Sequence, residues 1–368
     1  MNINLFEPYR IGNLELRNRF MRSATWDGSA DVSGAVTNAS VVLYRELGKK
    51  GIGLIVSGFA FVSLSGQAVE GQYGLYDDEM TAGLRRLAAA VHEGDSRIAL
   101  QIHHAGISAA GHIEDAMAVS RVPHITRPHH EMSEEEIEFV INDFVAAAGR
   151  AVAAGFDAVQ LHGAHGYLMS QFLSPVLNNR TDRWGGTLEN RARFHLEVIR
   201  RIKKAVGPDY PLLIKYGIRD ESVRGLSLAD GLEVARRMVE AGIDAIEVSA
   251  GIASIRAAIP TLKPGEPERA VFRERAAALK QAVNIPVALV CGIRSLNMAR
   301  DIVNSGAADM ISMCRPFIRE PDLLKRWQQL EQPSTCISCN LCHREIVAGR
   351  GLGCGQERII PQNLRLKS

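Results

Sequence analysis

The hydrophobic pattern of the chain repeats one unit, in which a helical stretch ends at a small residue and a glycine, and a short apolar run follows. The unit occurs at 49–58 (KKGIGLIVSG), 153–163 (AAGFDAVQLHG), 240–251 (EAGIDAIEVSAG) and 304–314 (NSGAADMISMC). A glycine just beyond a helix readily takes the left-handed conformation that ends it. The residues after it are nearly all apolar, as in a strand covered on both faces. The pattern therefore predicts strands that alternate with helices.

Four further apolar runs complete a set of eight expected strands: 19–25, 97–104, 211–217 and 285–292. Helices are predicted at 133–154, which opens with the capping-box spacing of Ser133 and Glu136, and at 188–206. Strand–helix alternation indicates a parallel sheet, either a (β/α)8 TIM barrel or an open doubly wound sheet. Eight units favour the barrel, and no G-x-G-x-x-G phosphate loop opens a helix after the first strand.

We expect two regions, an α/β barrel at 1–330 and a short cysteine-rich extension at 331–368. A length of 368 residues with 46% hydrophobic residues suits one large barrel. The irregular segments 104–132 and 171–187 follow strands, so they should lie at the C-terminal face, where barrel active sites are built. The pocket walls are expected to come from 104–132 and 252–275.

The charges are balanced, with 43 basic and 41 acidic residues. This gives no electrostatic case for binding nucleic acid or a membrane surface. The N-terminus lacks the apolar region of a signal peptide, and no apolar run reaches about 18 residues, so we expect a cytoplasmic protein. Four of the six cysteines lie between Cys336 and Cys354. Such clustering in a cytosolic enzyme indicates metal or redox chemistry more than disulfides.

Candidate catalytic residues follow the fourth expected strand, in LHGAHGYL. His162 and His165 could direct two N–H donors at one carbonyl oxygen and stabilise the enolate formed when a conjugated double bond is reduced. Tyr167 could supply the proton. Capping or packing histidines, or two zinc ligands without a third nearby, are the alternatives.

The block HGAHGYLMSQFLSPVLNNRTDRWGGTLENRARF (162–194) resembles the signature region of the old yellow enzyme family of NADH:flavin oxidoreductases. The likeness is strongest to the branch with enoate reductases, 2,4-dienoyl-CoA reductases and the barrel domains of trimethylamine dehydrogenases. The segment LFEPYRIGNLELRNRFMRSAT (5–25) is similar to the family's N-terminal β-hairpin and first strand. The resemblance implies an FMN flavoprotein that uses NAD(P)H.

The resemblance also implies which residues contact the FMN ring: Ser23, Ala24, Thr25, Gly58, Gln101 and Lys215. Lys215 corresponds to a cation that stabilises the anionic reduced flavin, whereas a solvated surface lysine is the alternative. Gly292 and Ile293 end the seventh expected strand, and Cys314 and Arg315 end the eighth. Loops after these two strands commonly bind phosphate, and Arg315 adds a cation there.

The extension contains a C-x2-C-x2-C-x11-C pattern made by Cys336, Cys339, Cys342 and Cys354. This spacing suits a [4Fe–4S] cluster or zinc, or the thiols are simply reduced. Dienoyl-CoA reductases and trimethylamine dehydrogenases carry a [4Fe–4S] cluster here and continue into two nucleotide-binding domains. Since this sequence ends at Ser368, a cluster would need a separate electron-transfer protein as its partner. We also expect a homo-oligomer.

Three functional hypotheses result. The first is an FMN-dependent ene-reductase that uses NAD(P)H to reduce the C=C bond of α,β-unsaturated carbonyl or thioester substrates. The second is an amine-type dehydrogenase or electron-transfer subunit that passes electrons between FMN and an iron–sulfur cluster. The third is a non-catalytic subunit or a metal-binding scaffold.

Overall fold

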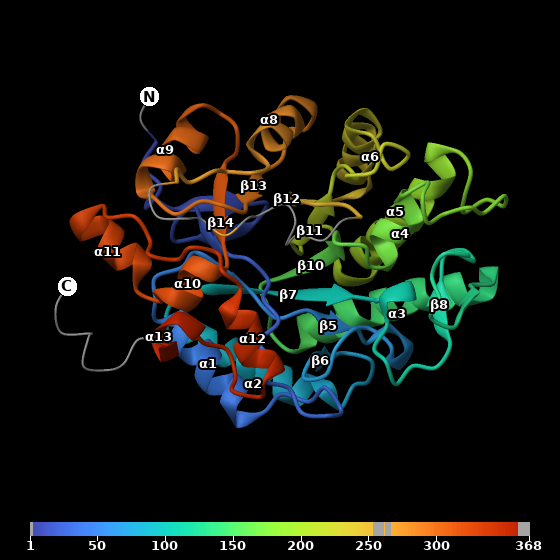
Figure 1. The fold of residues 1–368 in the computed structure, drawn as a ribbon, viewed down its shortest axis with the longest axis horizontal. Coiled ribbons are helices and arrows are strands. Elements are labelled where there is room, and N and C mark those ends of the chain that lie inside the picture. Colours follow the sequence, from blue (N-terminus) through green and yellow to red (C-terminus); the bar gives the residue numbers. More distant parts are fainter. Residues whose placement is uncertain (1–2, 253–260, 262–265, 360–368) are drawn as a thin grey trace.

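Eight parallel strands close into a barrel in the computed structural model, which describes residues 3–252, 261 and 266–359 (Figure 1). They pair in the order β10-β11-β12-β13-β14-β3-β4-β7, and β7 pairs back with β10. The strands are β3 (Phe20–Arg22), β4 (Leu54–Val56), β7 (Arg97–His103), β10 (Ala158–Gly163), β11 (Leu212–Gly217), β12 (Ala245–Ser249), β13 (Val287–Val290) and β14 (Met310–Met313). The predicted (β/α)8 TIM barrel is confirmed, and the doubly wound alternative is wrong because the sheet closes on itself.

Helices surround this barrel, and all but the last of them connect its strands. They are α1 (Asn38–Gly48), α2 (Met80–His92), α3 (Glu134–Ala153), α5 (Leu188–Val206), α6 (Leu228–Ala241), α8 (Arg273–Ala282), α9 (Leu296–Asn304) and α11 (Leu323–Leu330). The capping box predicted for α3 is confirmed, since Ser133 Oγ accepts from the Glu136 amide and the Glu136 carboxylate accepts from the Ser133 amide. No helix in the described part of the chain is long and apolar enough to span a membrane.

Side chains that point into the barrel form layers, because alternate residues of a strand face opposite sides. The layer nearest the N-terminal ends of the strands is apolar and packs against the hairpin of β1 (Tyr9–Ile11) and β2 (Leu14–Leu16). This layer includes Met21, Leu54, Ala99, Ala158, Leu213, Ala245, Ala288 and Met310. The expected N-terminal hairpin therefore closes one end of the barrel.

A polar layer lies two residues further along the strands. It consists of Ser23, Gln101, Gln160, Lys215, Glu247 and Ser312, all of which are buried. The strand register places Gln160 opposite Gln101 and Lys215 opposite Glu247. Strand pairing alone therefore brings together polar side chains that are far apart in the sequence.

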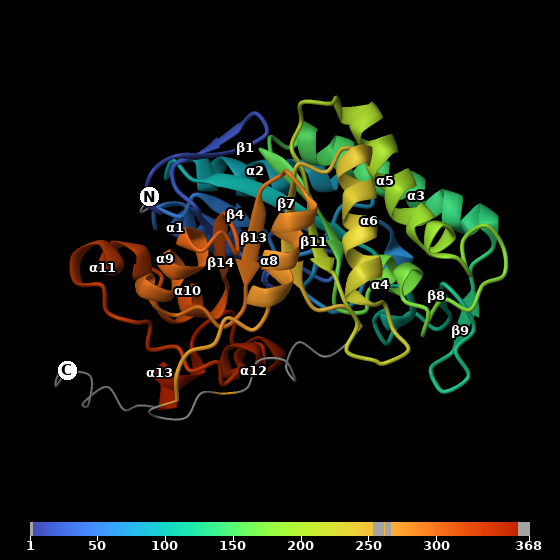
Figure 2. The same ribbon diagram turned by 90° about the horizontal axis from the view of Figure 1, so that it is seen from above.

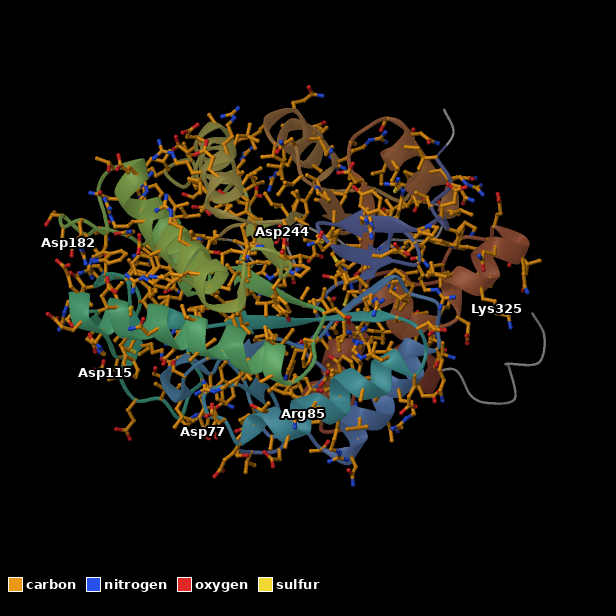
Figure 3. The ribbon with its side chains drawn as sticks, turned by 180° about the vertical axis from the view of Figure 1, so that it is seen from behind. Asp77, Arg85, Asp115, Asp182, Asp244 and Lys325 are labelled. Carbon is orange, nitrogen blue, oxygen red and sulfur yellow. The ribbon has the colours of Figure 1, made fainter. Side chains whose placement is uncertain are left out.

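The two irregular segments predicted from the sequence pack against each other. Residues 104–132 form η2 (Gly106–Ser108), β8 (Ala116–Ala118) and β9 (His129–Glu131), and α4 (Leu168–Leu173) leads into 171–187. The Arg180 side chain donates to the carbonyl oxygens of Val119 and Met132. Figure 3 shows Asp115 and Asp182, one from each segment, on the side of the molecule opposite Lys325 on α11.

The described part of the cysteine-rich extension packs on the C-terminal end of the barrel (Figure 2). It contains α12 (Leu341–Val347) and α13 (Gly355–Ile359), and it follows α10 (Arg315–Arg319) and α11. A short segment after β4 adds β5 (Ala60–Phe61), η1 (Leu64–Gly66) and β6 (Tyr73–Gly74). The His343 ring of α12 lies 5.5 Å from the Trp26 ring, between centroids. The described part of the extension thus packs directly against the barrel.

Candidate active site

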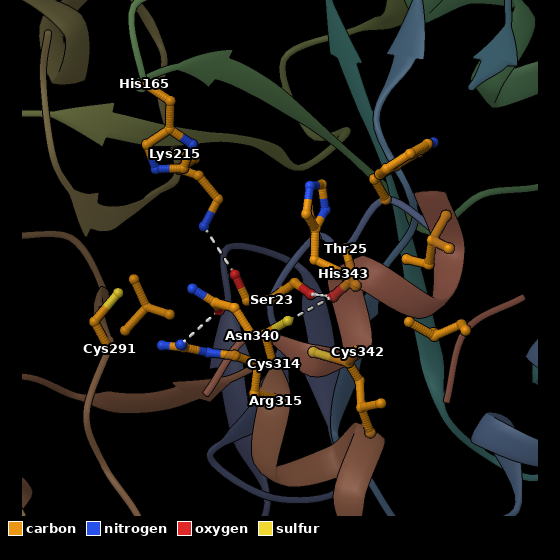
Figure 4. Close-up of a pocket in the computed structure, with 16 residues that line it drawn as sticks. Ser23, Thr25, His165, Lys215, Cys291, Cys314, Arg315, Asn340, Cys342 and His343 are labelled. Carbon is orange, nitrogen blue, oxygen red and sulfur yellow. Dashed lines mark hydrogen bonds between the residues drawn. The ribbon is translucent and has the colours of Figure 1, made fainter. Parts of the chain in front are cut away.

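A cavity of about 320 Å³ opens at the C-terminal end of the barrel, between the strands and the extension (Figure 4). Its barrel side is formed by loops and strand ends, and α12 forms the other side. The lining residues are Ser23, Ala24, Thr25, Trp26, His165, Lys215, Val290, Cys291, Cys314, Arg315, Ile318, Asn340, Cys342, His343, Ile346 and Leu352. Seven of the sequence-predicted FMN and catalytic residues line this cavity: Ser23, Ala24, Thr25, His165, Lys215, Cys314 and Arg315.

Lys215 is a buried cation at this cavity. Its Nζ lies 2.6 Å from Glu247 Oε2 and donates to Ser23 Oγ at 2.9 Å. Burial acts to raise the pKa of Glu247, but the Lys215 ammonium and hydrogen bonds to the carboxylate outweigh it and lower the pKa. Glu247 is therefore ionised, and Lys215 is not the solvated surface lysine of the alternative interpretation.

A smaller cavity of about 40 Å³ continues from the first and shares Val290, Cys291, Cys314 and Arg315 with it. Gly292, Ile293 and Arg294 extend its wall. Two guanidinium groups beside backbone from the loops after β13 and β14 make a site that suits a phosphate.

The loop after β13 requires glycine at position 292. Gly292 has φ +88°, and a β-carbon there would collide with the carbonyl oxygen of Arg269. Arg315 donates to Ser338 O at 3.2 Å and to Asn340 Oδ1 at 2.9 Å, and Arg294 donates to Ser338 Oγ. The extension thus holds both guanidinium groups at the cavity.

The predicted catalytic residues meet at the end of β10. The His162 ring lies 5.0 Å from the His165 ring and 4.9 Å from the Tyr167 ring, between centroids. His165 and Gly166 have φ +63° and +77°, so a left-handed turn brings His165 beside His162. His165 lines the cavity and contacts Ser249 Oγ at 2.7 Å, whereas His162 and Tyr167 are not part of its wall.

Burial fixes the protonation of these residues. Desolvation holds the pKa of His162 well below its usual value and lowers the pKa of His165 to about 3. The same cause raises the pKa of Tyr167 to about 12. The Ala164 amide donates to His162 Nδ1 at 3.4 Å, so the proton of the neutral ring is on Nε2. The cluster thus offers neutral N–H donors and a protonated phenol.

Two predicted FMN residues, Gly58 and Gln101, lie outside the walls of both cavities. The Gly58 amide donates to Tyr44 Oη at 2.6 Å. Gln101 is buried in the polar layer, where its Nε2 donates to Gln160 Oε1 at 2.7 Å.

The expected pocket walls also differ in part. Among the described residues, none of 104–132 and none of 252–275 lines the cavity, and 253–260 and 262–265 lie outside the described residues. The extension supplies that wall instead, through residues such as Asn340, His343 and Ile346.

Sequence reasoning missed two buried polar residues, Glu247 and His103. Glu247 is the only charged residue in the apolar run of β12, which is a usable signal. His103 packs against Tyr167, with ring centroids 4.6 Å apart, and neither of its ring nitrogens has a partner among the described residues. Its position in β7, two residues after Gln101, places it on the same inner face of the barrel.

The four cysteines of the extension are not gathered around one point. Within residues 3–252, 261 and 266–359, no three His, Cys, Asp or Glu side chains are placed to hold a metal ion. Cys342 lines the cavity, Cys336 is buried, and Cys354 Sγ accepts from Arg319 at 3.4 Å. This arrangement does not fit a [4Fe–4S] cluster or a zinc ion, and we derive no chemistry through either.

Comparison with known sequences identifies relatives over almost the whole chain. The profile of the NADH:flavin oxidoreductase / NADH oxidase family matches residues 4–332. An NADPH dehydrogenase of Bacillus cytotoxicus is 35% identical, over 87% of this chain and 91% of the relative. An NADH oxidase of Thermoanaerobacter brockii is 39% identical, over 99% of this chain and 55% of the relative. The chain therefore spans only about half the length of that NADH oxidase.

Solved structures show the same architecture. A 2-naphthoyl-CoA reductase in complex with 2-naphthoyl-CoA is similar with a TM-score of 0.87 and 30% identity, over 96% of this chain and 57% of that one. A histamine dehydrogenase from Rhizobium sp. 4-9 is similar with a TM-score of 0.83 and 27% identity, over 95% of this chain and 51% of that one.

Proposed function

The chain belongs to the NADH:flavin oxidoreductase / NADH oxidase family, and we propose that it is an FMN-dependent ene-reductase. It would take electrons from NAD(P)H and reduce the C=C bond of an α,β-unsaturated carbonyl or thioester. The observation that carries this proposal is that the buried Lys215 cation and the His162–His165–Tyr167 cluster lie at the same end of one barrel.

The residues present fit FMN. The smaller cavity combines Arg294 and Arg315 with the Gly292–Ile293 backbone and would hold the phosphate. Lys215 offers a positive charge, and the Gln101 amide a hydrogen bond, for the polar edge of the ring. Bound FMN would supply hydride transfer, and the protein would supply binding, orientation and electrostatics.

The histidines would bind the substrate oxygen. A neutral imidazole N–H can donate to a carbonyl or thioester oxygen without bringing a charge to the ground state. The bond strengthens as negative charge develops on that oxygen, which is the kind of stabilisation that lowers a barrier. Tyr167, protonated because burial raises its pKa, would donate a proton to the α-carbon.

The second candidate is oxidation of an amine, which the likeness to a histamine dehydrogenase favours. Two neutral N–H donors suit a carbonyl oxygen better than an amine, which is why we propose the ene-reductase first. Electron transfer to a separate protein and a homo-oligomeric state remain predictions.

An absorbance spectrum of anaerobically purified protein, before and after loading with FMN, tests the proposal. We expect flavin bands that NAD(P)H bleaches and that cyclohexenone restores under anaerobic conditions. Protein that takes up no FMN would contradict the proposal. Flavin bands that histamine bleaches, in protein that does not turn over the enone, would favour the second candidate.

Iron and zinc should be measured on the same sample. About four irons per chain would mean that the cysteines rearrange around a cluster. That result would direct attention to an electron-transfer partner, whereas the absence of iron and zinc would leave the extension as a wall of the active site.

A further inference from the structure

Three side chains of the polar layer form a directed chain of hydrogen bonds across the barrel. Gln160 Nε2 donates to Glu247 Oε2 at 3.0 Å, and Gln101 Nε2 donates to Gln160 Oε1 at 2.7 Å. All three side chains are buried, with at most 2% of each residue exposed. Water therefore does not compete for these bonds.

We infer that Glu247 is a positioning residue that fixes, through Gln160, which end of the Gln101 amide is left free to bind a ligand. A carboxylate has no proton and can only accept, so Gln160 must turn its NH₂ group to Glu247. Gln160 then presents its carbonyl oxygen to Gln101, which must donate in turn. The carbonyl oxygen of Gln101 is the group that remains, and the hydrogen bonds of Gln101 within the described residues use its amide nitrogens and not this oxygen.

Glu247 is suited to set this direction because it stays ionised. Its Oε2 also accepts from Lys215 at 2.6 Å, and its Oε1 accepts from Ser312 at 2.7 Å. A neutral side chain of the same shape would donate as easily as it accepts. The orientation of both amides would then no longer be determined by charge.

This inference rests on the proposed function and adds a selection rule to it. The pyrimidine part of a flavin has two carbonyl acceptors and a single N–H donor, at N3. A free Gln101 carbonyl oxygen can bond only to that N–H. The layer would therefore select a ring with an N–H at this position, and reject one in which a methyl group replaces the hydrogen.

The test measures the dissociation constants of FMN and 3-methyl-FMN by fluorescence quenching. The quantity compared is the dissociation constant of 3-methyl-FMN divided by that of FMN. Because both ligands carry the same phosphate and ring charge, the ratio isolates the N3 position. Gln101→Leu, which removes the amide, gives the baseline that reflects only the bulk of the methyl group. We call the chain of hydrogen bonds from Glu247 through Gln160 to Gln101 the relay. Two variants interrupt it, Gln160→Leu and the nearly isosteric Glu247→Gln. Ser312→Ala is the matched control, because it removes one bond to Glu247 outside the relay.

We expect the wild-type ratio to exceed the Gln101→Leu baseline roughly three- to tenfold, the value of one hydrogen bond between uncharged groups. Gln160→Leu and Glu247→Gln should fall to the baseline, and Ser312→Ala should keep the wild-type ratio. A wild-type ratio equal to the baseline overturns the inference, and so does a wild-type ratio in either relay variant. Circular dichroism identifies a variant that does not fold, in which case the other relay variant and the wild-type ratio still decide.

Failure of this inference and failure of the proposed function give different results. If wild-type protein binds FMN and NAD(P)H bleaches it, but the ratios do not respond to the relay variants, only the role of Glu247 is wrong. If wild-type protein does not bind FMN, the proposed function itself is wrong.

Discussion

Lys215 Nζ lies 2.6 Å from Glu247 Oε2, although the two side chains are only 4% and 1% exposed. Each charge is removed from water and depends on the other for compensation. Removing one partner of such a buried pair is strongly destabilising, because it leaves the other charge unpaired.

Lys215→Met should therefore lower the free energy of unfolding by about 3–5 kcal/mol, measured by urea denaturation at pH 7. The double variant Lys215→Met/Glu247→Leu should recover most of this loss, since it removes both charges. Lys280→Met is the control, because the Lys280–Asp309 pair, at 2.9 Å, is more exposed and should contribute about 1 kcal/mol or less. Equal losses of unfolding free energy for Lys215→Met and Lys280→Met would contradict the conclusion that Lys215 and Glu247 compensate each other's buried charge.

His162→Ala should slow the reoxidation of dithionite-reduced, FMN-loaded protein by cyclohexenone. The expected decrease is about 10²–10³-fold, because one donor to the developing oxyanion is lost. Stopped-flow absorbance under anaerobic conditions measures this step without NAD(P)H. His92→Ala, which removes a surface partner of Asp157, should keep the wild-type rate. An unchanged rate in His162→Ala would refute the donor role.

Tyr167→Phe should lower turnover of the same enone by about 10²-fold or more, if the phenol is the proton donor. The pKa of Tyr167, raised to about 12 by burial, also predicts that the phenol stays protonated to above pH 10. Wild-type turnover should thus show no loss from this group between pH 7 and 10. Tyr76→Phe, a tyrosine stacked on Phe61, serves as the control. Full activity in Tyr167→Phe would assign the proton to another donor.

Stability should decrease in acid because of buried histidines such as His195. Burial lowers the pKa of His195 to about 3, below the value of about 6.5 in an unfolded chain. Between these pH values the unfolded state binds more protons than the folded state. Protonation of His195 therefore leaves the free energy of unfolding unchanged above about pH 6.5 and lowers it progressively as the pH falls towards 3.

His195→Phe should flatten this dependence by up to about 1.4 kcal/mol per pH unit between pH 6 and 4. Urea denaturation at several pH values measures the slope. At pH 7.5 His195 is neutral in both the folded and the unfolded state, so a difference between variant and wild type at this pH reports the change in packing alone. A slope equal to that of the wild type would show that His195 does not contribute.

The barrel could be predicted from the sequence because its strands are short apolar runs, four of which follow a glycine that ends a helix, as at Gly155 and Gly242. These signals are local. The candidate catalytic cluster could also be predicted, since His162, His165 and Tyr167 are close in the sequence. The wall formed by His343 and Asn340 was not, because nothing local indicates where a segment after the last strand will pack.

The relay was not predicted for a different reason. Gln101, Gln160 and Glu247 lie on three strands, and their contact depends on the pairing register and on the inward direction of each side chain. A charged residue in an apolar strand indicates a buried partner but does not identify it. Lys215, which was predicted as a cofactor contact, becomes its partner only once β11 and β12 are paired.

The polar layer also limits how this barrel could be redesigned for another coenzyme. A ring with an acceptor in place of the flavin N–H would require the Gln101 amide to turn over, and Gln160 would then face it with the wrong group. A designer who changed only the residue nearest the new ring would leave a mismatch one or two strands away. Substitutions would have to be introduced together, on β7, β10 and β12, with a replacement for Glu247 that still neutralises Lys215.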